Sequence, residues 1–327
     1  MDTATHFVMG VGLAGLAYTD PVVAGDPKLA AVILLATIVG SQAPDFDTLL
    51  RLKNNAAYIR NHRGLSHSIP FWLIWILSIT GLICLIFRDV PPGHVALWVT
   101  IAVCLHVFTD LFNTYGTQAF RPFTNKWISW NIIHIFDPFI FGTHVAAIML
   151  WITGLVPPAP LFITLYVIIG LYYIWRTWSH FITRKAVRDM DNKRQEGDTY
   201  YIIPTVSWNR WHVVKAHQNG SYDIGGLNGK HLFWTKHATP STHPAVEASK
   251  SYRDVQAFRY FSSFAVAEVE ELEWGYIVRW GDVRYRHRRQ YPFVAVVAMD
   301  KQFGLINSYI GWLSDEKMQK RLSLHTN

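Results

Sequence analysis

Histidine and aspartate residues recur at the ends of apolar segments in the first half of this sequence. Imidazole and carboxylate groups are common ligands of divalent metal ions, so these residues predict a metal site if the fold gathers them. The candidate ligands are His6, Asp45, His62, His67, His106 and Asp110. The last two are four residues apart, which places both side chains on one face of a helix, where one ion can bridge them.

Each candidate also has a simpler explanation when it is considered alone. His6 could be incidental, and Asp45, which follows a proline, suits a turn or a helix cap. The two loop histidines could be solvated or bind lipid phosphates, and the i, i+4 pair could be a structural hydrogen-bonded pair. Ionisable groups within apolar segments are costly and usually functional. The shared position of all six at segment ends therefore favours the metal site.

A divalent ion at such a site predicts hydrolysis of an ester or phosphoester. It lowers the pKa of a bound water and polarises an ester oxygen, and two ions would clamp the attacking and leaving oxygens. We expect one or two ions, with Zn²⁺ favoured and Mn²⁺ or Fe²⁺ also compatible. Cys84 and Cys104 lie in apolar runs and predict no thiolate ligand. We expect Asp47 to position the water or accept its proton, and Arg63 to neutralise a substrate phosphate.

Apolar segments of bilayer length must position these residues. Roughly 20 apolar residues cross the hydrocarbon core, and Trp and Tyr near the segment ends fit interfacial anchoring. Four runs predict spanning helices: Ile69–Phe87, Val95–Phe112, Pro138–Val156 and Leu161–Trp178. Two shorter runs, Phe7–Tyr18 and Leu29–Gln42, predict tilted spans, a re-entrant pair, or helices packed against the others.

The composition changes near Trp178. Residues 1–178 hold nine Lys or Arg and eight Asp, whereas residues 179–327 hold 21 basic and 15 acidic residues. This contrast predicts a helical membrane domain at 1–178 that carries the metal site, a linker or helix extension at 179–197, and a smaller soluble domain at 198–327.

Basic residues predict the orientation in the membrane. If the basic cluster beyond the last span is cytoplasmic, loops 43–68 and 113–137 are cytoplasmic too. Those loops carry six Lys or Arg, whereas the opposite loops carry only Lys28 and Arg88. We therefore expect the candidate ligands and the C-terminal domain at the cytoplasmic face, provided that both short runs span.

Short segments rich in β-branched and aromatic residues follow residue 198 and predict a mostly β (α+β) domain. The expected strands are Tyr200–Val206, Trp211–Ala216, Tyr276–Trp280, Val283–Arg286, Phe293–Met299 and Leu305–Ile310. Asn-Gly at 219–220 and 228–229, with Gly225-Gly226, predicts hairpin turns. Helices are expected at Ser241–Phe258 and Ser314–Leu322.

The motifs resemble the YfhP-like (YdjM-related) family of bacterial inner-membrane proteins, which are described as predicted metal-dependent hydrolases. The resemblance spans nearly the whole chain and is carried by Asp2–His6, Gly40–Asp47, Asn61–Ser68, His106–Asp110, Asn113–Gln118, Phe136–Phe139 and Tyr291–Ala295. It implies a multi-pass protein of the bacterial inner membrane that hydrolyses its substrate with a bound metal.

That family is distantly similar to the zinc-dependent phospholipase C and P1-type nuclease group, an all-helical fold with a multi-zinc site. A His-x-x-x-Asp pair, an N-terminal His and an upstream Asp recur there, which would correspond here to His106 with Asp110, His6 and Asp45. The first 178 residues contain no Glu, so the His-x-x-x-Glu pair that would complete a three-zinc cluster is missing. One or two ions are therefore expected.

Two functions remain open on the sequence alone. The first is a membrane-bound hydrolase acting on a phosphoester or other ester, including a lipid, at the cytoplasmic face. The second is a non-catalytic anchor whose basic C-terminal domain binds a partner or anionic lipid through a run such as 284–289. Such a run is more often a solvated strand face, and nucleic acid is not a favoured partner. A transporter is disfavoured, because the polar groups collect at one face and not at the midplane.

Overall fold

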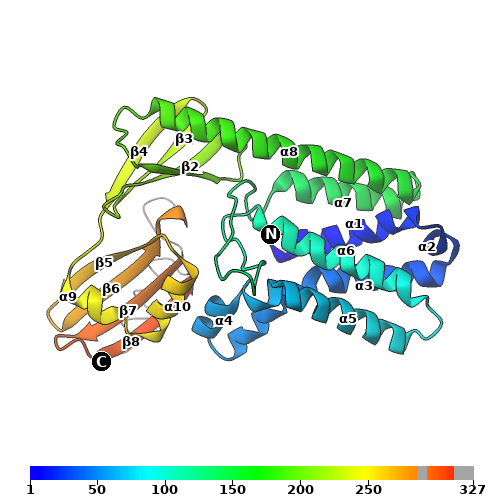
Figure 1. Cartoon of the computed structure of the whole chain (residues 1–327), viewed down its shortest axis with the longest axis horizontal. Coiled ribbons are helices and arrows are strands. Elements are labelled where there is room, and N and C mark those ends of the chain that lie inside the picture. The colour runs from blue at the N-terminus through cyan, green and yellow to red at the C-terminus, as the bar shows by residue number, and fades with distance from the viewer. Residues whose placement is uncertain (286–292, 313–327) are drawn as a thin grey trace. The chain divides into compact units, whose positions relative to one another are not determined.

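The computed structural model describes residues 1–285 and 293–312 (Figure 1). These residues form two compact units. The first comprises Met1–Asp47, His62–Thr183 and Pro204–Trp208, and the second comprises Thr48–Asn61, Arg184–Ile203 and the described residues from Asn209 onward. The first unit is helical and apolar and the second is mostly β, which confirms the predicted fold class. The predicted helix Ser314–Leu322 lies outside the described residues.

The helical unit contains six principal helices among the described residues, and short 3-10 segments join some of them. In chain order the helices are α1 (Thr3–Leu16), α2 (Pro21–Gly25), α3 (Pro27–Gln42), α5 (Ile69–Ile86), α6 (Pro92–Leu111), α7 (Pro138–Ile152) and α8 (Pro158–Met190), of which α2 is a single short turn. The 3-10 segments are η1 (Ala17–Thr19), η2 (Ala43–Leu52) and η3 (Leu65–His67). Helix α1 packs against α3 and α7, and α6 packs against α3 and α5.

Aspartate caps begin several of these helices. Asp26 and Asp137 each precede a proline, and their carboxylates accept backbone N–H groups of the first turn of α3 and α7. Proline suits this position because its missing N–H would have no intrahelical partner. Asp2 caps α1 in the same way, with its Oδ1 3.1 Å from the nitrogens of Ala4 and Thr5.

Four helical segments of the described chain are long and apolar enough to cross a membrane: Pro27–Leu52, Ile69–Ile86, Pro92–Leu111 and Pro158–Met190. Leu77 on α5 is 71% exposed and Leu171 on α8 is 61% exposed, as expected of helix faces that contact lipid. The predicted span at 138–156 is shorter, because α7 ends at Ile152. The run at 29–42, which was predicted to be short, lies within the long segment Pro27–Leu52.

A glycine lets α1 approach α3 closely. A Cβ at Gly10 would collide with Ser41 and would press on the Thr37 carbonyl, so only glycine fits there. This contact fixes the start of α1 beside the end of α3. His6 lies one turn before Gly10, and Ser41 lies in the last turn of α3.

The second unit contains two four-stranded antiparallel sheets, with orders β1-β2-β3-β4 and β5-β6-β7-β8. Apolar residues from both sheets share one core cluster, which includes Val214, Ile224, Val266 and Val296. Helix α10 packs against α4 and β7. The elements are α4 (Asn55–Asn61), β1 (Thr199–Pro204), β2 (Arg210–Ala216), β3 (Tyr222–Asn228), β4 (His231–Ala238), α9 (Pro244–Ser249), α10 (Arg253–Phe261), β5 (Ala265–Leu272), β6 (Gly275–Asp282), η4 (Val283–Tyr285), β7 (Phe293–Asp300) and β8 (Leu305–Trp312).

The structure corrects several predictions in this unit. Strands β3, β4 and β5 were not expected, and Gly225-Gly226 lies inside β3 at a bulge instead of in a turn. The predicted helix 241–258 is two helices, because the chain turns between Ser249 and Arg253. The predicted strand at 283–286 is wrong for its described part, where Val283–Tyr285 is a 3-10 turn. Both Asn-Gly pairs do lie at hairpin turns, with positive φ at Gly220 and Gly229.

A buried lysine ties the end of α8 to the first sheet. The Lys215 side chain on β2 is 1% exposed, and its Nζ lies 2.9 Å from both Asp191 Oδ2 and Asp223 Oδ2. Burial lowers the pKa of Lys215, but the hydrogen bonds to the two carboxylates outweigh it and raise the pKa above its ordinary value. The ammonium therefore stays charged at neutral pH and stabilises the fold.

We expect Lys215→Ala to destabilise the second unit by about 3–5 kcal/mol, because it leaves two aspartates without their buried cation. Thermal and chemical unfolding of the detergent-solubilised protein, followed by circular dichroism, measures the loss. Lys230→Ala is the matched control, because Lys230 is exposed in the neighbouring hairpin turn. Equal unfolding midpoints for the two variants would contradict the assigned role of Lys215.

Candidate metal centre

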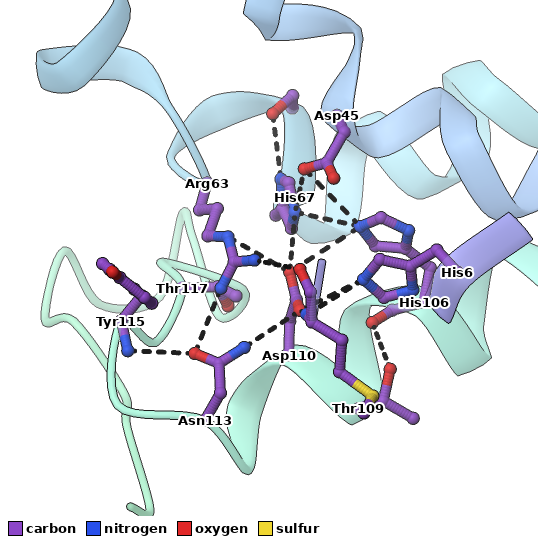
Figure 2. A network of polar contacts seen from close by, with 12 residues as sticks. His6, Asp45, Arg63, His67, His106, Thr109, Asp110, Asn113, Tyr115 and Thr117 are labelled. Atoms are coloured by element: carbon purple, nitrogen blue, oxygen red, sulfur yellow. Dashed lines mark hydrogen bonds and ion pairs between the residues drawn. The ribbon is translucent and has the colours of Figure 1, made fainter. Parts of the chain in front are cut away.

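Four buried or nearly buried side chains from three segments converge at one end of α6 (Figure 2). Asp45 comes from η2, His67 from η3, and His106 and Asp110 from the last turns of α6. The Nε2 atom of His67 lies 3.3 Å from His106 Nε2, 3.3 Å from Asp110 Oδ2 and 3.6 Å from Asp45 Oδ1. His106 Nε2 lies 3.8 Å from Asp45 Oδ1 and 3.7 Å from Asp110 Oδ2.

Five of the six separations among these four ligand atoms are close to those of a tetrahedral metal site. With metal–ligand bonds of about 2.0–2.1 Å, the edge of a ligand tetrahedron is roughly 3.3–3.4 Å. The five separations above run from 3.3 to 3.8 Å. Two imidazole nitrogens and two carboxylate oxygens are a suitable donor set for a divalent ion. The cluster could therefore hold one metal ion with little rearrangement.

Hydrogen bonds on the far side of each imidazole orient the two histidines. His106 Nδ1 donates to the Ser41 carbonyl at 2.6 Å, which leaves the lone pair on Nε2. His67 Nδ1 lies 3.0 Å from Ser66 Oγ. Burial, followed by repulsion from His106, lowers the pKa of His67 well below its ordinary value. A neutral imidazole is the form that binds a metal ion.

Two carboxylate oxygens in the cluster lack a hydrogen-bond donor. Asp45 Oδ1 and Asp110 Oδ2 are buried, and neither accepts a hydrogen bond from any of the residues that the structure describes. A buried carboxylate oxygen without a hydrogen bond is costly, and charge makes the cost larger; the ion pair with Arg63 offsets part of it at Asp110. Both of these oxygens belong to the near-tetrahedral set, so a bound cation would satisfy them together.

His6 lies beside this set. Its ring stacks on His106 with centroids 3.7 Å apart, and its Nε2 is 3.3 Å from Asp110 Oδ1. The Met1 nitrogen contacts the same Asp110 oxygen and lies 3.0 Å from His6 Nε2. His6 therefore contacts Asp110 and His106 but lies outside the four-residue group, and its role as a metal ligand stays a prediction.

Arg63 turns its side chain into the centre. Its Nη1 donates to Asn113 Oδ1 at 3.1 Å, its Nη2 donates to the Met1 carbonyl at 2.8 Å, and its Nε lies 3.3 Å from Asp110 Oδ2. The residue is 3% exposed and has a φ of 59°. This guanidinium is bound within the protein, where it offsets part of the Asp110 charge. Its predicted contact with a substrate phosphate stays a prediction.

Asp47 and His62 form a second group with Asp45, and the ligand atoms of all three lie within 4.8 Å of one another. His62 Nδ1 is 2.8 Å from Asp47 Oδ1, and Asp47 Oδ2 accepts from Ser66 Oγ at 2.7 Å and the Arg63 nitrogen at 2.9 Å. The His62 side chain is 19% exposed, whereas those of His67 and His106 are fully buried. This second group is therefore the more accessible one, and Asp45 is common to both.

Three further His and Asp residues of the helical unit lie elsewhere. Asp137 caps α7 and accepts from the Tyr172 hydroxyl at 2.7 Å. His134 bonds the Phe136 carbonyl, and His144 is buried within α7, where it bonds the Ile140 carbonyl. None of these three belongs to the metal-ligand groups found among the described residues.

Three supporting residues were not identified from the sequence. Ser66 bonds both Asp47 and His67, the Ser41 carbonyl orients His106, and Asn113 joins Arg63 to Asp110 Oδ1, 3.1 Å from its amide nitrogen. Ser66 and Asn113 lie in the quoted motifs one and three residues from a candidate ligand, and that proximity was the available signal. The role of the Ser41 backbone carbonyl could not be predicted, because every residue type carries such a group.

The second unit has its own His/Asp group, formed by His217, Asp223 and His237. Asp223 Oδ2 already receives the Lys215 ammonium at 2.9 Å, and His217 lies between Asp198 and Asp223 at 2.8 and 3.0 Å. A lysine ammonium on the shared carboxylate opposes a bound cation. This group fits a structural ion network better than a metal site.

Each half of the chain matches a known protein family or domain. Residues 1–182 match the family model described as YdjM inner membrane protein, and residues 244–322 match the YfhP C-terminal alpha/beta plait domain. An uncharacterized protein YfhP of Bacillus subtilis (strain 168) is 41% identical over 328 residues, covering 99% of each chain. No solved structure matches the chain.

The family matches and the apolar helices together support an inner-membrane location. The matched membrane region contains every residue of the metal-ligand cluster, and the relative aligns from end to end. The chain therefore belongs to the YdjM inner membrane protein family, as a member that carries a YfhP-type C-terminal domain.

Proposed function

We propose that this protein is a membrane-bound metal-dependent hydrolase that acts on a phosphoester or other ester at the cytoplasmic face of the inner membrane. The observation that carries the proposal is the near-tetrahedral set of His67, His106, Asp45 and Asp110, with two buried carboxylate oxygens that lack hydrogen-bond donors. Zn²⁺ suits this geometry and donor set best, and Mn²⁺ or Fe²⁺ would also be accepted.

The two ligand groups suggest two ions with different tasks. Four protein donors around the buried position would close its coordination, as in structural sites. Asp45, Asp47 and His62 offer only three donors at the more exposed position, which leaves room for water and a substrate oxygen. Divalent ions bound there would lower the pKa of a coordinated water and polarise the ester.

The protein's own side chains would orient the reactants. Asp47 is held by Ser66, the Arg63 nitrogen and His62, so its carboxylate is fixed beside the accessible position. We propose that it positions the attacking water and takes up its proton. Arg63 holds Asp110 and Asn113 in place, and its charge supports an anionic group at the centre.

A non-catalytic lipid anchor draws less support. In the proposed basic run, Arg284 is 7% exposed and is paired with Asp282 at 2.7 Å, so it does not present its charge to a lipid headgroup. Residues 286–289 of that run lie outside the described residues.

Removal of a ligand from the buried set should remove the metal. We expect purified His106→Ala and Asp110→Asn proteins to lose at least one bound ion per chain, measured by inductively coupled plasma mass spectrometry. His144→Ala is the matched control, because His144 is also a buried histidine of a membrane helix but lies outside the cluster. A wild-type protein that takes up no Zn²⁺, Mn²⁺ or Fe²⁺ would refute the site.

The accessible position should be separable from the buried one. We expect His62→Ala to lower the metal content from two ions to one, because the shared ligand Asp45 and the buried set remain intact. Zinc titration of the metal-stripped protein measures both sites in one experiment. A wild-type stoichiometry of one would reject the two-ion arrangement and leave Asp47 and His62 as a hydrogen-bonded pair.

Hydrolysis should depend on both the metal and Asp47. We expect cleavage of bis(p-nitrophenyl) phosphate to stop on chelation and to return with Zn²⁺. Asp47→Asn should lower kcat by about 10²–10⁴-fold while the buried metal is retained, because it removes a proton acceptor that is also a ligand of the accessible ion. His144→Ala again serves as control, and full turnover by the Asp47 variant would exclude its catalytic role.

A further inference from the structure

An apolar groove of about 660 Å³ runs along α8 in the helical unit, with α6 and the middle of α1, at Met9, as its other walls. Its lining is aromatic and aliphatic, and includes Met9, Phe108, Phe112, Ile174, Trp178 and Phe181. On α8 the lining extends from Tyr166 to Phe181, which is roughly 22 Å of helix. This volume is within the usual range of about 300–1,000 Å³ for small-molecule sites.

The hydroxyl groups in the lining already donate within the protein, and besides them the lining has only the Trp178 indole N–H as a side-chain donor. Thr109 Oγ1 donates to the His106 carbonyl, Thr177 Oγ1 to the Tyr173 carbonyl, and the Tyr166 hydroxyl to the Met9 carbonyl. The groove therefore offers no free hydroxyl donor among these side chains. A sugar or nucleotide would lose its hydration there with little compensation, whereas a hydrocarbon chain would not.

The groove shares a wall with the metal centre. Met1, Met9 and Phe112 belong to one apolar cluster, and the Tyr173 hydroxyl contacts Met1 Sδ at 3.5 Å. The backbone atoms of Met1 contact Asp110, His6 and Arg63 on the other side. A single residue thus lies between the groove and the ligand cluster.

The groove is continuous with the lipid-facing surface. Helices α6 and α8 are both candidate membrane spans, and lining residues Ile174, Trp178, Phe181 and Phe108 are each at least half exposed. One leaflet of the hydrocarbon core is about 15 Å deep, so a groove of this length can take up a membrane lipid's chain directly from the bilayer.

We propose that this groove binds one hydrocarbon chain of a membrane phospholipid and thereby brings the lipid's phosphoester headgroup to the metal centre. This inference rests on the proposed hydrolase function and names its substrate class. The chain would enter sideways from the bilayer, and the headgroup would extend past Met1 to the accessible ligands Asp47 and His62.

A glycine in the groove allows a direct test. Gly170 lines the groove, and a Cβ added there meets no atom within 4 Å, so Gly170→Phe fills the groove without a clash at its base. Gly81 on α5 is equally open and lies outside the lining, so Gly81→Phe is the matched control. Both variants place the same side chain on an exposed face of a membrane helix.

The probes are phosphatidylglycerol, a phosphodiester like the soluble substrate, with a diazirine on one long acyl chain for photo-crosslinking, and the same lipid without the diazirine for hydrolysis. We expect wild-type and Gly81→Phe proteins to crosslink within 105–112 and 166–181. Gly170→Phe should lower both the crosslinking and the lipid hydrolysis about tenfold, because each methylene excluded from an apolar site weakens binding. Cleavage of bis(p-nitrophenyl) phosphate and the metal content should stay unchanged.

The outcomes separate the two proposals. Lipid labelling and turnover by Gly170→Phe at wild-type levels would overturn the groove assignment, and cleavage of the soluble diester would then still support the hydrolase. A second outcome is that crosslinks are lost only in Gly170→Phe while the wild-type protein cleaves neither the lipid nor bis(p-nitrophenyl) phosphate. That outcome would support lipid binding in the groove and refute the hydrolase.

Discussion

The arrangement of the helical unit depends on two aspartate carboxylates that share one buried space. Asp45 and Asp110 each direct an oxygen without a hydrogen-bond donor into the same cluster. Neutral imidazoles cannot offset two negative charges, and the two other basic groups that contact the cluster, the Arg63 guanidinium and the Met1 nitrogen, both pair with Asp110; among the described residues Asp45 pairs only with histidines. Buried charges persist when they are paired or coordinate a metal. A divalent cation is therefore the simplest partner that makes the folded arrangement of this cluster favourable.

The ends of the membrane helices supply what the cluster needs. The last carbonyls of a helix have no intrahelical donor, and the Ser41 carbonyl in the last turn of α3 accepts from His106 instead. The short segments η2 and η3 then carry Asp45 and His67 out of the regular helices and back toward α6. Gly10 allows α1 to lie close enough to α3 for His6 to stack on His106. Close helix packing and unpaired helix-end groups thus build one site from residues far apart in sequence.

Much of this organisation could be predicted because it rests on strong local patterns. Apolar runs of bilayer length predicted the membrane helices, and the His and Asp residues at their ends predicted the candidate metal ligands. The strands that were missed lacked such patterns: β5 is rich in Glu, and β3 contains Gly225-Gly226, which usually marks a turn. Pairing with the neighbouring strands of each sheet outweighed these local preferences. The inward turn of Arg63 and the role of Ser41 depend on backbone positions, which residue types alone do not encode.

The two sides of the centre differ in polarity, and this difference bears on how a substrate would lie. Through Met1, the Asp110 side adjoins the apolar groove, whose hydroxyl groups donate within the protein. The Asp45 side adjoins Asp47 and His62, which are the more accessible ligands. An amphiphilic molecule would minimise its desolvation cost with its chain on the first side and its charged ester toward the second. The same asymmetry would bring the scissile bond to the accessible group of Asp45, Asp47 and His62, where coordination positions remain open. The buried four-donor set would then have a structural role.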